Sequence, residues 1–520
     1  MKGNRTKNAT RNMVFGLLLK LYHLLVPFLM RTAMIYLLGV QYLGLNGLFT
    51  SILQVLNLAE LGVGSAMTFS MYKPIAENDE VTICALMRLY KVYYRVIGII
   101  ILTIGLCLLP FIPNLISGDI PANINIYVLY VMNLMATVLT YWLYAYKNCI
   151  LTAHQRSDVA NKVQLITDTI MYGTQIFVLA VFHNYYLYVL ANLATRALTN
   201  IIIAKAADRM YPQFQARGNL PKESVDKINR RIKDLFTSKL GLVVNENLDT
   251  VIVSAFLGLT TLAIYQNYFY MVKAVIGIMK TVLYSCMAGI GNSLVVETKE
   301  HNYANFKKFT FIVCWLSGVC FACFVCLYQP FMELWMGADL MLDFSYVILF
   351  SVYFFIYEIF TVINIYKDAA GIWHEDRFRP LICAVANLFL NLALIRYIGL
   401  YAVLLSTVLS LLVIGIPWLI HNVFSLIFDT KLIKEFVWIL CKSVVMTVIA
   451  CGVTYFVCTL VPFDAYIELF AKAIVCAIVP NVVFLIIYGR STEFADMLVI
   501  ANRMTGGKVK PLRKYIEKFN

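Results

Sequence analysis

The chain has 520 residues, of which 61% are hydrophobic and 14% are charged, whereas soluble domains contain about 25% charged residues. This composition excludes an ordinary soluble domain and is typical of an integral membrane protein. The formal net charge of +14 then indicates loops that bind anionic lipid head groups, and no nucleic-acid partner is expected.

Apolar stretches follow one another along nearly the whole chain. Each is long enough to cross a hydrocarbon core of about 30 Å as a helix of about 20 residues. In chain order they cover residues 13–38, 45–72, 94–112, 125–147, 160–182, 185–206, 236–258, 262–294, 309–336, 344–366, 378–398, 401–423, 435–460 and 466–488. The first is too long for a signal peptide and has no small-residue cleavage site, so we expect it to be retained. The sequence therefore predicts an all-α integral membrane protein of about 14 transmembrane helices.

Lysine and arginine gather in every second connection between these stretches. The basic connections are the N-terminus, 73–95, 147–162, 208–234, 295–308, 367–379, 424–434 and the tail 491–520. The opposite connections 39–44, 113–123 and 337–343 contain neither residue. Because positive residues stay on the cytoplasmic side of short loops, the sequence predicts a multi-pass protein with both termini in the cytoplasm.

An internal repeat is visible at an offset of 219 residues, which places residues 31–45 over 250–264 and Gly39 over Gly258. The same offset aligns the first two apolar stretches with the seventh and eighth, as expected for a transporter built from repeated bundles. We therefore expect five regions. They are an N-terminal six-helix bundle (1–206), a cytoplasmic linker (207–235), a C-terminal six-helix bundle (236–423), two further helices (424–490) and a basic cytoplasmic tail (491–520).

Ionisable residues lie within many of the apolar stretches, where each costs about 2.5 to 3.5 kcal/mol unless it meets a partner or a water-filled cavity. The candidate substrate-binding residues are Lys20, Arg31, Arg196, Lys273, Lys280, Asn133, Tyr144 and Gln164. The candidate residues for ion coupling or charge pairing are Glu60, Asp168, Glu246 and Asp249. Lysine and arginine suit an anionic substrate, and amide and phenol groups suit hydroxyls. Alternatively, the polar residues only hold helices together and the charges pair with one another.

A further basic stripe consists of Arg88, Lys91 and Arg95, which share one helical face. Two interpretations are open for this stripe. It anchors the helix at the membrane interface, or it forms a cytoplasmic entrance where a lipid phosphate binds.

Thirteen cysteines are present, and Cys320, Cys323 and Cys326 are spaced by three within an apolar stretch. No histidine stands nearby to complete a zinc site, so we expect small buried hydrophobic residues, no metal and no cofactor. The sequence also lacks a nucleotide-binding loop of the form GxxxxGK[ST], so ATP is not an expected energy source.

Residues 27–79 contain the segments LLGVQYLGLNGLF and LAELGVGSA. This region resembles the start of the polysaccharide transporter branch of the multidrug, oligosaccharidyl-lipid and polysaccharide exporter superfamily, which includes O-antigen and capsule repeat-unit flippases. The resemblance implies two six-helix bundles that face one another across a central cavity in the bacterial cytoplasmic membrane. It also implies the substrate, an undecaprenyl-pyrophosphate-linked oligosaccharide moved to the outer leaflet for surface polysaccharide assembly. Polysaccharide polymerase and glycosyltransferases are then expected partners, besides membrane lipids.

Related lipid II flippases use cations in helices 1, 2 and 8 of the cavity, and the resemblance makes Arg31, Lys273 and Lys280 candidates for that role. The second helix here offers Glu60 instead of a cation, so the correspondence is partial. One alternative is an ion-coupled multidrug exporter of the same superfamily, which would use buried acids such as Asp168 or Asp249. Another is a membrane polysaccharide polymerase or transferase, but the short outer loops leave little room for catalytic groups. We therefore expect a transporter and not an enzyme.

Overall fold

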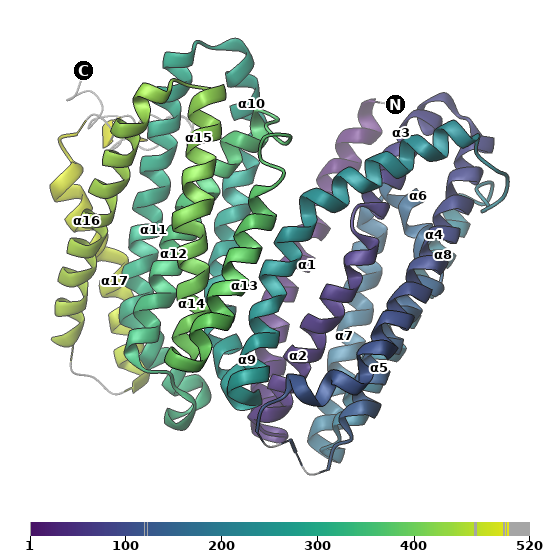
Figure 1. Ribbon diagram of the computed structural model, residues 1–520, viewed down its shortest axis with the longest axis horizontal. Helices are drawn as coiled ribbons and strands as arrows, with labels where there is room; N and C mark the ends of the chain where they lie inside the picture. Colours follow the sequence, from purple (N-terminus) through teal and green to yellow (C-terminus); the bar gives the residue numbers. More distant parts are fainter. Residues whose placement is uncertain are drawn as a thin grey trace. The chain divides into compact units, whose positions relative to one another are not determined.

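The computed structural model describes residues 2–118, 120–121, 123–461, 465–491, 494–495 and 497–498 (Figure 1). Within these ranges, the side chains of residues 2–10, 238, 242, 245, 246 and 465 lie outside the description. The described part is helical and contains no strand. It forms two compact units, unit 1 (residues 1–266) and unit 2 (residues 267–520). The five predicted regions remain predictions, and the basic tail lies almost wholly outside the described residues.

Unit 1 contains the helices α1 (Lys2–Leu37), α2 (Val40–Leu56), α3 (Val63–Glu77), α4 (Glu80–Leu108), α5 (Ile126–Trp142), α6 (Asn148–Ala153), α7 (Ser157–Phe182), α8 (Tyr185–Met210) and the first part of α9 (Lys222–Ser285). Short polar side chains begin several of them. The Asp79 carboxylate accepts the Thr82 amide of α4 at 3.0 Å, and the Asn184 side chain accepts the Leu187 amide of α8 at 3.2 Å. Such caps satisfy amide groups that have no partner in the first helical turn.

Two helix breaks occur at the glycines that the repeat aligns. Gly39 separates α1 from α2 with φ 114° and ψ 160°, and Gly258 interrupts α9 with φ 84° and ψ 174°. Only glycine enters this backbone region readily, because a side chain at positive φ clashes with its own carbonyl groups. The shared geometry supports the internal repeat.

Unit 2 contains the second part of α9, then α10 (Met287–Val296), α11 (Lys299–Met336), α12 (Phe344–Ala369), α13 (Arg379–Ile398), α14 (Leu400–Leu409), α15 (Ile416–Leu426), α16 (Ile433–Thr459) and α17 (Ala465–Tyr488). Its core is rich in aromatic residues. The Phe306 ring lies 4.8 Å from Phe436 and 4.6 Å from Tyr366, measured between ring centroids. Helices α16 and α17 pack against one another and against α11 (Figure 1).

Twelve described segments are long and apolar enough to cross a membrane, or up to 13 if the pair Ile126–Trp142 and Ala145–Ala153, bent by 46°, is one span. The predicted all-α membrane class is confirmed. The bent pair accounts for one of the two spans that separate twelve from the expected 14. The other is missing because Asn247–Val296 counts as one segment, although the Gly258 break divides it where helices 236–258 and 262–294 were predicted to meet.

Two predicted helices are less regular than expected. The stretch 45–72 is interrupted between Leu56 and Val63, where Asn57–Glu60 form a 3-10 turn and Gly62 has φ 87°. The polar residues of this turn have partners elsewhere in unit 1, since Asn57 accepts the Tyr141 hydroxyl at 3.1 Å. The stretch 125–147 bends because Tyr144 has φ 60°, a left-handed conformation. Neither break has a proline to mark it in the sequence.

Candidate functional site

The first candidate region in unit 1 lies on α1 and α7. Asp168 of α7 contacts His23 of α1, with 2.8 Å between the carboxylate Oδ2 and the ring Nε2. Lys20 stands one turn before His23 and is exposed. Arg31 is half-buried and interacts electrostatically with Tyr188 of α8. The sequence analysis named three of these charged residues but missed His23, although the i, i+3 spacing from Lys20 places it on the same face.

Arg196 lies near the middle of α8, is exposed, and donates from Nε to the Asn192 side chain at 3.0 Å. A guanidinium exposed at this depth in a membrane helix favours water-filled surroundings over lipid. Asn133 and Gln164 are half-buried, and the Asn133 amide donates to the Leu129 carbonyl one turn back on α5. The contacts of Asn133 therefore hold its own helix.

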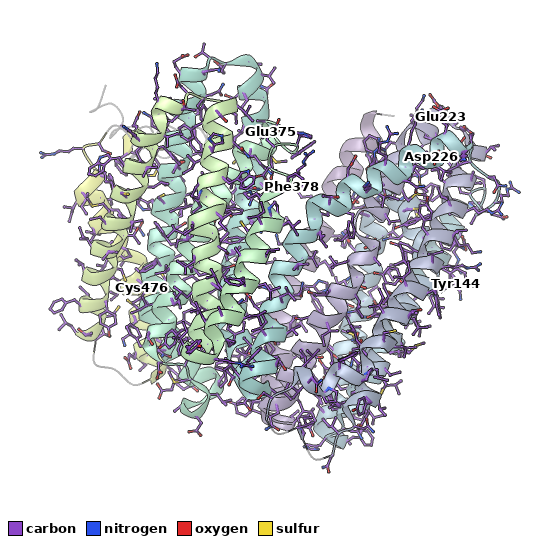
Figure 2. All side chains as sticks on the ribbon, viewed as in Figure 1. Tyr144, Glu223, Asp226, Glu375, Phe378 and Cys476 are labelled. Atoms are coloured by element: carbon purple, nitrogen blue, oxygen red, sulfur yellow. The ribbon has the colours of Figure 1, made fainter. Side chains whose placement is uncertain are left out.

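A hydroxyl-rich, partly open cavity of about 260 Å³ is formed by residues of unit 1. Its lining residues are Gly64, Thr68, Tyr90, Tyr94, Tyr144, Ala145, Asn148, Cys149, Thr152, Asn200 and Ile203. Tyr90 donates its hydroxyl to Tyr94 at 2.6 Å, and Tyr94 donates to Glu60 at 3.1 Å. This chain of hydrogen bonds connects the cavity wall to the helix break after Leu56. Of the eight predicted substrate-binding residues, Tyr144 (Figure 2) lines this cavity.

Asp249 is 8% exposed and interacts electrostatically with Tyr265. The predicted site residue Glu246 lies outside the described side chains. A role for Asp249 in charge pairing or ion coupling therefore stays a prediction.

In unit 2 the predicted cations lie on the second part of α9. The Lys273 ammonium is 4.7 Å from the Phe269 ring centroid, and the Lys280 ammonium is 5.0 Å from the Tyr357 ring centroid of α12. Spaced by seven, the two lysines occupy one face of α9. Beside Tyr357, Glu358 is fully buried, and neither of its carboxyl oxygens has a hydrogen-bond partner among the described residues. Glu358 interacts electrostatically with Lys280 and was not among the predicted site residues.

The predicted entrance residues have different surroundings. Arg88 donates from one guanidinium nitrogen to the Gly218 carbonyl at 3.0 Å and to the Asn219 side chain at 2.7 Å. Arg88, on α4, therefore holds the connection between α8 and α9 in place. The Lys91 ammonium lies 5.8 Å from the Tyr146 ring centroid, and Arg95 is exposed.

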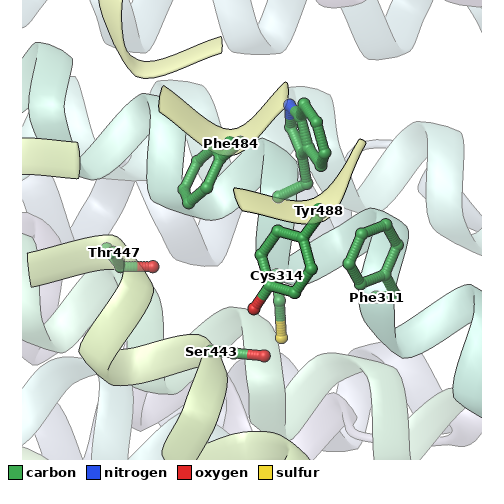
Figure 3. A pocket seen from close by; sticks show the side chains of 7 residues that line it. Phe311, Cys314, Ser443, Thr447, Phe484 and Tyr488 are labelled. Atoms are coloured by element: carbon green, nitrogen blue, oxygen red, sulfur yellow. The ribbon is translucent and has the colours of Figure 1, made fainter. Parts of the chain in front are cut away.

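A second, much smaller space lies between α11, α16 and α17 of unit 2 (Figure 3). Phe311, Trp315, Phe484 and Tyr488 surround it, and its volume is about 10 Å³. That volume is at most the size needed for one water molecule. This space is a packing defect and not a substrate site.

Buried ion pairs hold a loop of unit 2 next to α13. Asp376 accepts two hydrogen bonds from Arg379, at 2.6 and 2.8 Å, and one from Lys367 at 3.2 Å. In unit 1, the fully buried Asp158 instead pairs with Arg11 at 2.9 Å and Arg156 at 3.0 Å. Sequence analysis assigned these basic residues to loops without identifying the acids that hold them.

No known protein family profile and no curated protein matches the chain. Several solved structures share its fold. "Lipid II flippase MurJ, inward closed conformation" has a TM-score of 0.62 and 15% identity, covering 92% of this chain and 99% of that chain. An inward-facing multidrug resistance MATE family transporter of the MOP superfamily has a TM-score of 0.60 and 13% identity, covering 79% and 96%. A mutant of the Vibrio cholerae MATE transporter VcmN has a TM-score of 0.52 and 15% identity, covering 82% and 98%. The chain thus has the fold of these multi-pass membrane proteins.

Proposed function

We propose that this protein is a flippase that moves an undecaprenyl-pyrophosphate-linked oligosaccharide from the cytoplasmic to the outer leaflet by alternating access. It would act in the bacterial cytoplasmic membrane, with both termini cytoplasmic, during surface polysaccharide assembly. The fold shared with a lipid II flippase and with multidrug transporters supports a transport role.

The cationic face of α9 carries the proposal. Lys273 and Lys280 lie within a segment suited to cross the membrane, where each charge costs about 2.5 to 3.5 kcal/mol on insertion scales. Their ammonium groups lie over aromatic rings, whose faces attract the positive charge. A pyrophosphate provides the anionic oxygens that lysine binds through charge-assisted hydrogen bonds.

The sugar part of the substrate needs a different environment. Hydroxyl groups form hydrogen bonds with phenol and amide side chains, which line the 260 Å³ cavity of unit 1. Tyrosine faces also pack against the apolar face of a sugar ring. The lipid tail can remain in the bilayer, because only the polar head group must avoid hydrocarbon.

An ion-coupled multidrug exporter is the second candidate function. The titratable pair of His23 and Asp168 within the apolar part of α1 and α7 favours it, as does the likeness to multidrug transporters. A cationic drug would need acids to bind it, whereas an anionic lipid head group would need the lysines of α9.

The test is transport of a lipid-linked oligosaccharide by the purified protein in proteoliposomes. We expect Lys280→Ala to reduce the rate roughly 10- to 100-fold, because a hydrogen bond to a charged group contributes about 1.5 to 3 kcal/mol. Lys280→Arg should retain more activity. Lys442→Ala is the matched control, since Lys442 of α16 lies at a similar distance, 5.1 Å, from the Tyr488 ring centroid. Normal transport by Lys280→Ala, Lys273→Ala and Arg31→Ala at matched protein levels would contradict the proposal.

The membrane potential separates the two candidate functions. A pyrophosphate diester carries roughly two negative charges, so its movement out of a negative interior gains up to about 4.6 kcal/mol at 100 mV. We expect an inside-negative potential, set with potassium and valinomycin, to accelerate oligosaccharide flipping. Drug efflux without any oligosaccharide transport would favour the exporter.

A further inference from the structure

Three thiol groups from three different helices meet in the interior of unit 2. They belong to Cys326 of α11, Cys458 of α16 and Cys476 of α17 (Figure 2 labels Cys476). Their residues are 5%, 3% and 0% exposed, and the three Sγ atoms all lie within 4.8 Å of one another. The Sγ atoms of Cys458 and Cys476 are 3.9 Å apart.

The separation of Cys458 and Cys476 is the one that two sulfur ligands of one metal ion require. A zinc–thiolate bond of about 2.3 Å places two sulfur ligands of one tetrahedral or trigonal ion about 3.8 to 4.0 Å apart. The Cys458 and Cys476 sulfurs already have this separation. The Cys326 sulfur, at most 4.8 Å from each of them, needs to move by no more than about 1 Å to share the same ion. A disulfide, with its bond of about 2.0 Å, would need a larger movement of Cys458 and Cys476.

The surroundings select the kind of ion. Cys323, Leu327 and Val475 pack against the three cysteines, so the cluster has sulfur and hydrocarbon neighbours. Sulfur ligands favour soft ions, whereas Ca²⁺ and Mg²⁺ require oxygen. Lys472 lies one turn before Cys476 on the same face of α17 and pairs with Glu468. Its ammonium group places positive charge near a site that becomes negative when the thiols ionise.

We propose that Cys326, Cys458 and Cys476 bind one soft d¹⁰ cation, Zn²⁺ or Cu⁺, and that this ion fastens α16 and α17 to α11. Each thiol that binds releases its proton to solvent, so the ligands are thiolates. Cys323 stands one turn before Cys326 on α11 and is the nearby candidate for a fourth ligand. The site is separate from the lysines proposed to bind substrate, and it does not depend on the proposed transport function.

Sequence spacing alone did not identify this three-cysteine site. Cys320, Cys323 and Cys326 share one helix and were expected to be small buried hydrophobic residues, with no metal bound. The structure combines only Cys326 of this set with two cysteines of α16 and α17 in the three-sulfur cluster. Ligands so far apart in the chain do not form a recognisable zinc spacing.

The experiment measures metal bound to the full-length protein in detergent, after reduction and removal of metal with a chelator. Zn²⁺ and Cu⁺ are added in separate samples, and bound metal is counted by mass spectrometry after dialysis. We expect one ion per chain and a higher thermal unfolding temperature with metal. Cd²⁺ added as an optical probe should produce a thiolate-to-metal absorption band. Zn²⁺ bound without Cu⁺, or the reverse, identifies the ion.

Cys326→Ala should lose both the bound ion and the metal-dependent rise in unfolding temperature. Cys314→Ala is the matched control, because Cys314 is also on α11 and is also 5% exposed. It stands 12 residues away, about 18 Å along the helix, and its variant should bind metal normally. If Cys326→Ala does not fold, Cys458→Ser replaces it with a smaller change of volume.

A further measurement needs no variant. In partly denatured wild-type protein, metal should slow alkylation of Cys326, Cys458 and Cys476 and leave Cys107 and Cys441, which are exposed, unaffected. Equal metal content in wild type and Cys326→Ala would overturn the proposal. A Cys458–Cys476 disulfide in protein isolated without reductant, with no metal bound after reduction, would overturn it as well.

Discussion

Residues 146–154 of unit 1 and 366–374 of unit 2 contain the same residues at three positions but give them different contacts. Each segment starts with Tyr-Lys and places a histidine seven residues after the lysine. Lys147 pairs with Asp208 of α8, which is 52% exposed, whereas Lys367 pairs with Asp376, which is 4% exposed. The two Tyr-Lys segments are 220 residues apart, one residue more than the repeat offset of 219, and their lysines hold a half-exposed ion pair in one unit and a buried ion pair in the other.

The glycine pair that the repeat aligns shows that similar backbone angles do not imply similar contacts. Gly39 and Gly258 have similar backbone angles, yet the space around them differs. A Cβ atom at Gly39 would meet nothing within 4 Å, whereas one at Gly258 would lie 2.7 Å from the Ser117 carbonyl oxygen. The two halves share a fold and differ in the contacts that stabilise it.

The largest expected effect is on the buried pair of unit 2. In Asp376→Asn, Arg379 loses the carboxylate that neutralises it, and its side chain is only 5% exposed. Lys367, which is 8% exposed, loses one of its two acidic partners and keeps Asp368 at 2.6 Å. Removal of one partner from a buried ion pair lowers the free energy of unfolding by about 3 to 5 kcal/mol. In Asp208→Asn, Lys147 can turn towards water, and we expect a loss of at most about 1 kcal/mol. Thermal unfolding of the detergent-solubilised variants measures both effects.

Glu223→Gln is the control for this pair of variants, because the Lys227–Glu223 pair on α9 is exposed. Its unfolding temperature should stay close to that of the wild type. An equal decrease in unfolding temperature for Asp376→Asn and Asp208→Asn would show that burial does not determine how much each ion pair stabilises the protein.

The next effect concerns the glycine breaks. Gly39→Ala introduces only backbone strain, which we expect to lower the free energy of unfolding by about 1 to 3 kcal/mol. Gly258→Ala adds a clash with Ser117, whose amide donates to the Ser254 carbonyl at 2.9 Å. We therefore expect Gly258→Ala to lower the unfolding temperature more than Gly39→Ala. The opposite order would mean that the contact with Ser117 relaxes without loss.

Hydrophobic length was sufficient to predict most of the helices. The stretch predicted at 160–182 corresponds to α7 (Ser157–Phe182), and 185–206 corresponds to α8 (Tyr185–Met210). Length could not predict the break between Leu56 and Val63, because its polar residues are satisfied by tyrosines from distant helices. Periodicity reports which face a residue occupies and not which neighbour it meets.

The same limit applies to the candidate sites. A charged residue at membrane depth is visible in the sequence, and so Lys273, Lys280 and Asp168 were identified. Their partners depend on how helices pack, and so Tyr357 and His23 were not assigned to them. The cysteine cluster is the extreme case, since each of its ligands lies on a different helix. The roles of the predicted site residues remain predictions.

The smallest expected effect concerns the histidines of the two Tyr-Lys segments. His154 packs against Tyr211, with 4.3 Å between ring centroids, and contacts the Ile150 carbonyl at 2.9 Å through Nδ1. Burial lowers the pKa of His154 below its ordinary value of 6.5, although the Ile150 contact opposes this. The unfolded chain therefore binds a proton more readily than the folded protein, and stability falls as pH drops through about 6.5.

His374 is exposed and contacts Arg377. We expect His154→Gln to reduce the fall in unfolding temperature between pH 7 and pH 5, measured in one detergent at constant ionic strength, and His374→Gln to leave it unchanged. A larger change in His374→Gln than in His154→Gln would show that His154 is not the histidine that makes unfolding sensitive to pH.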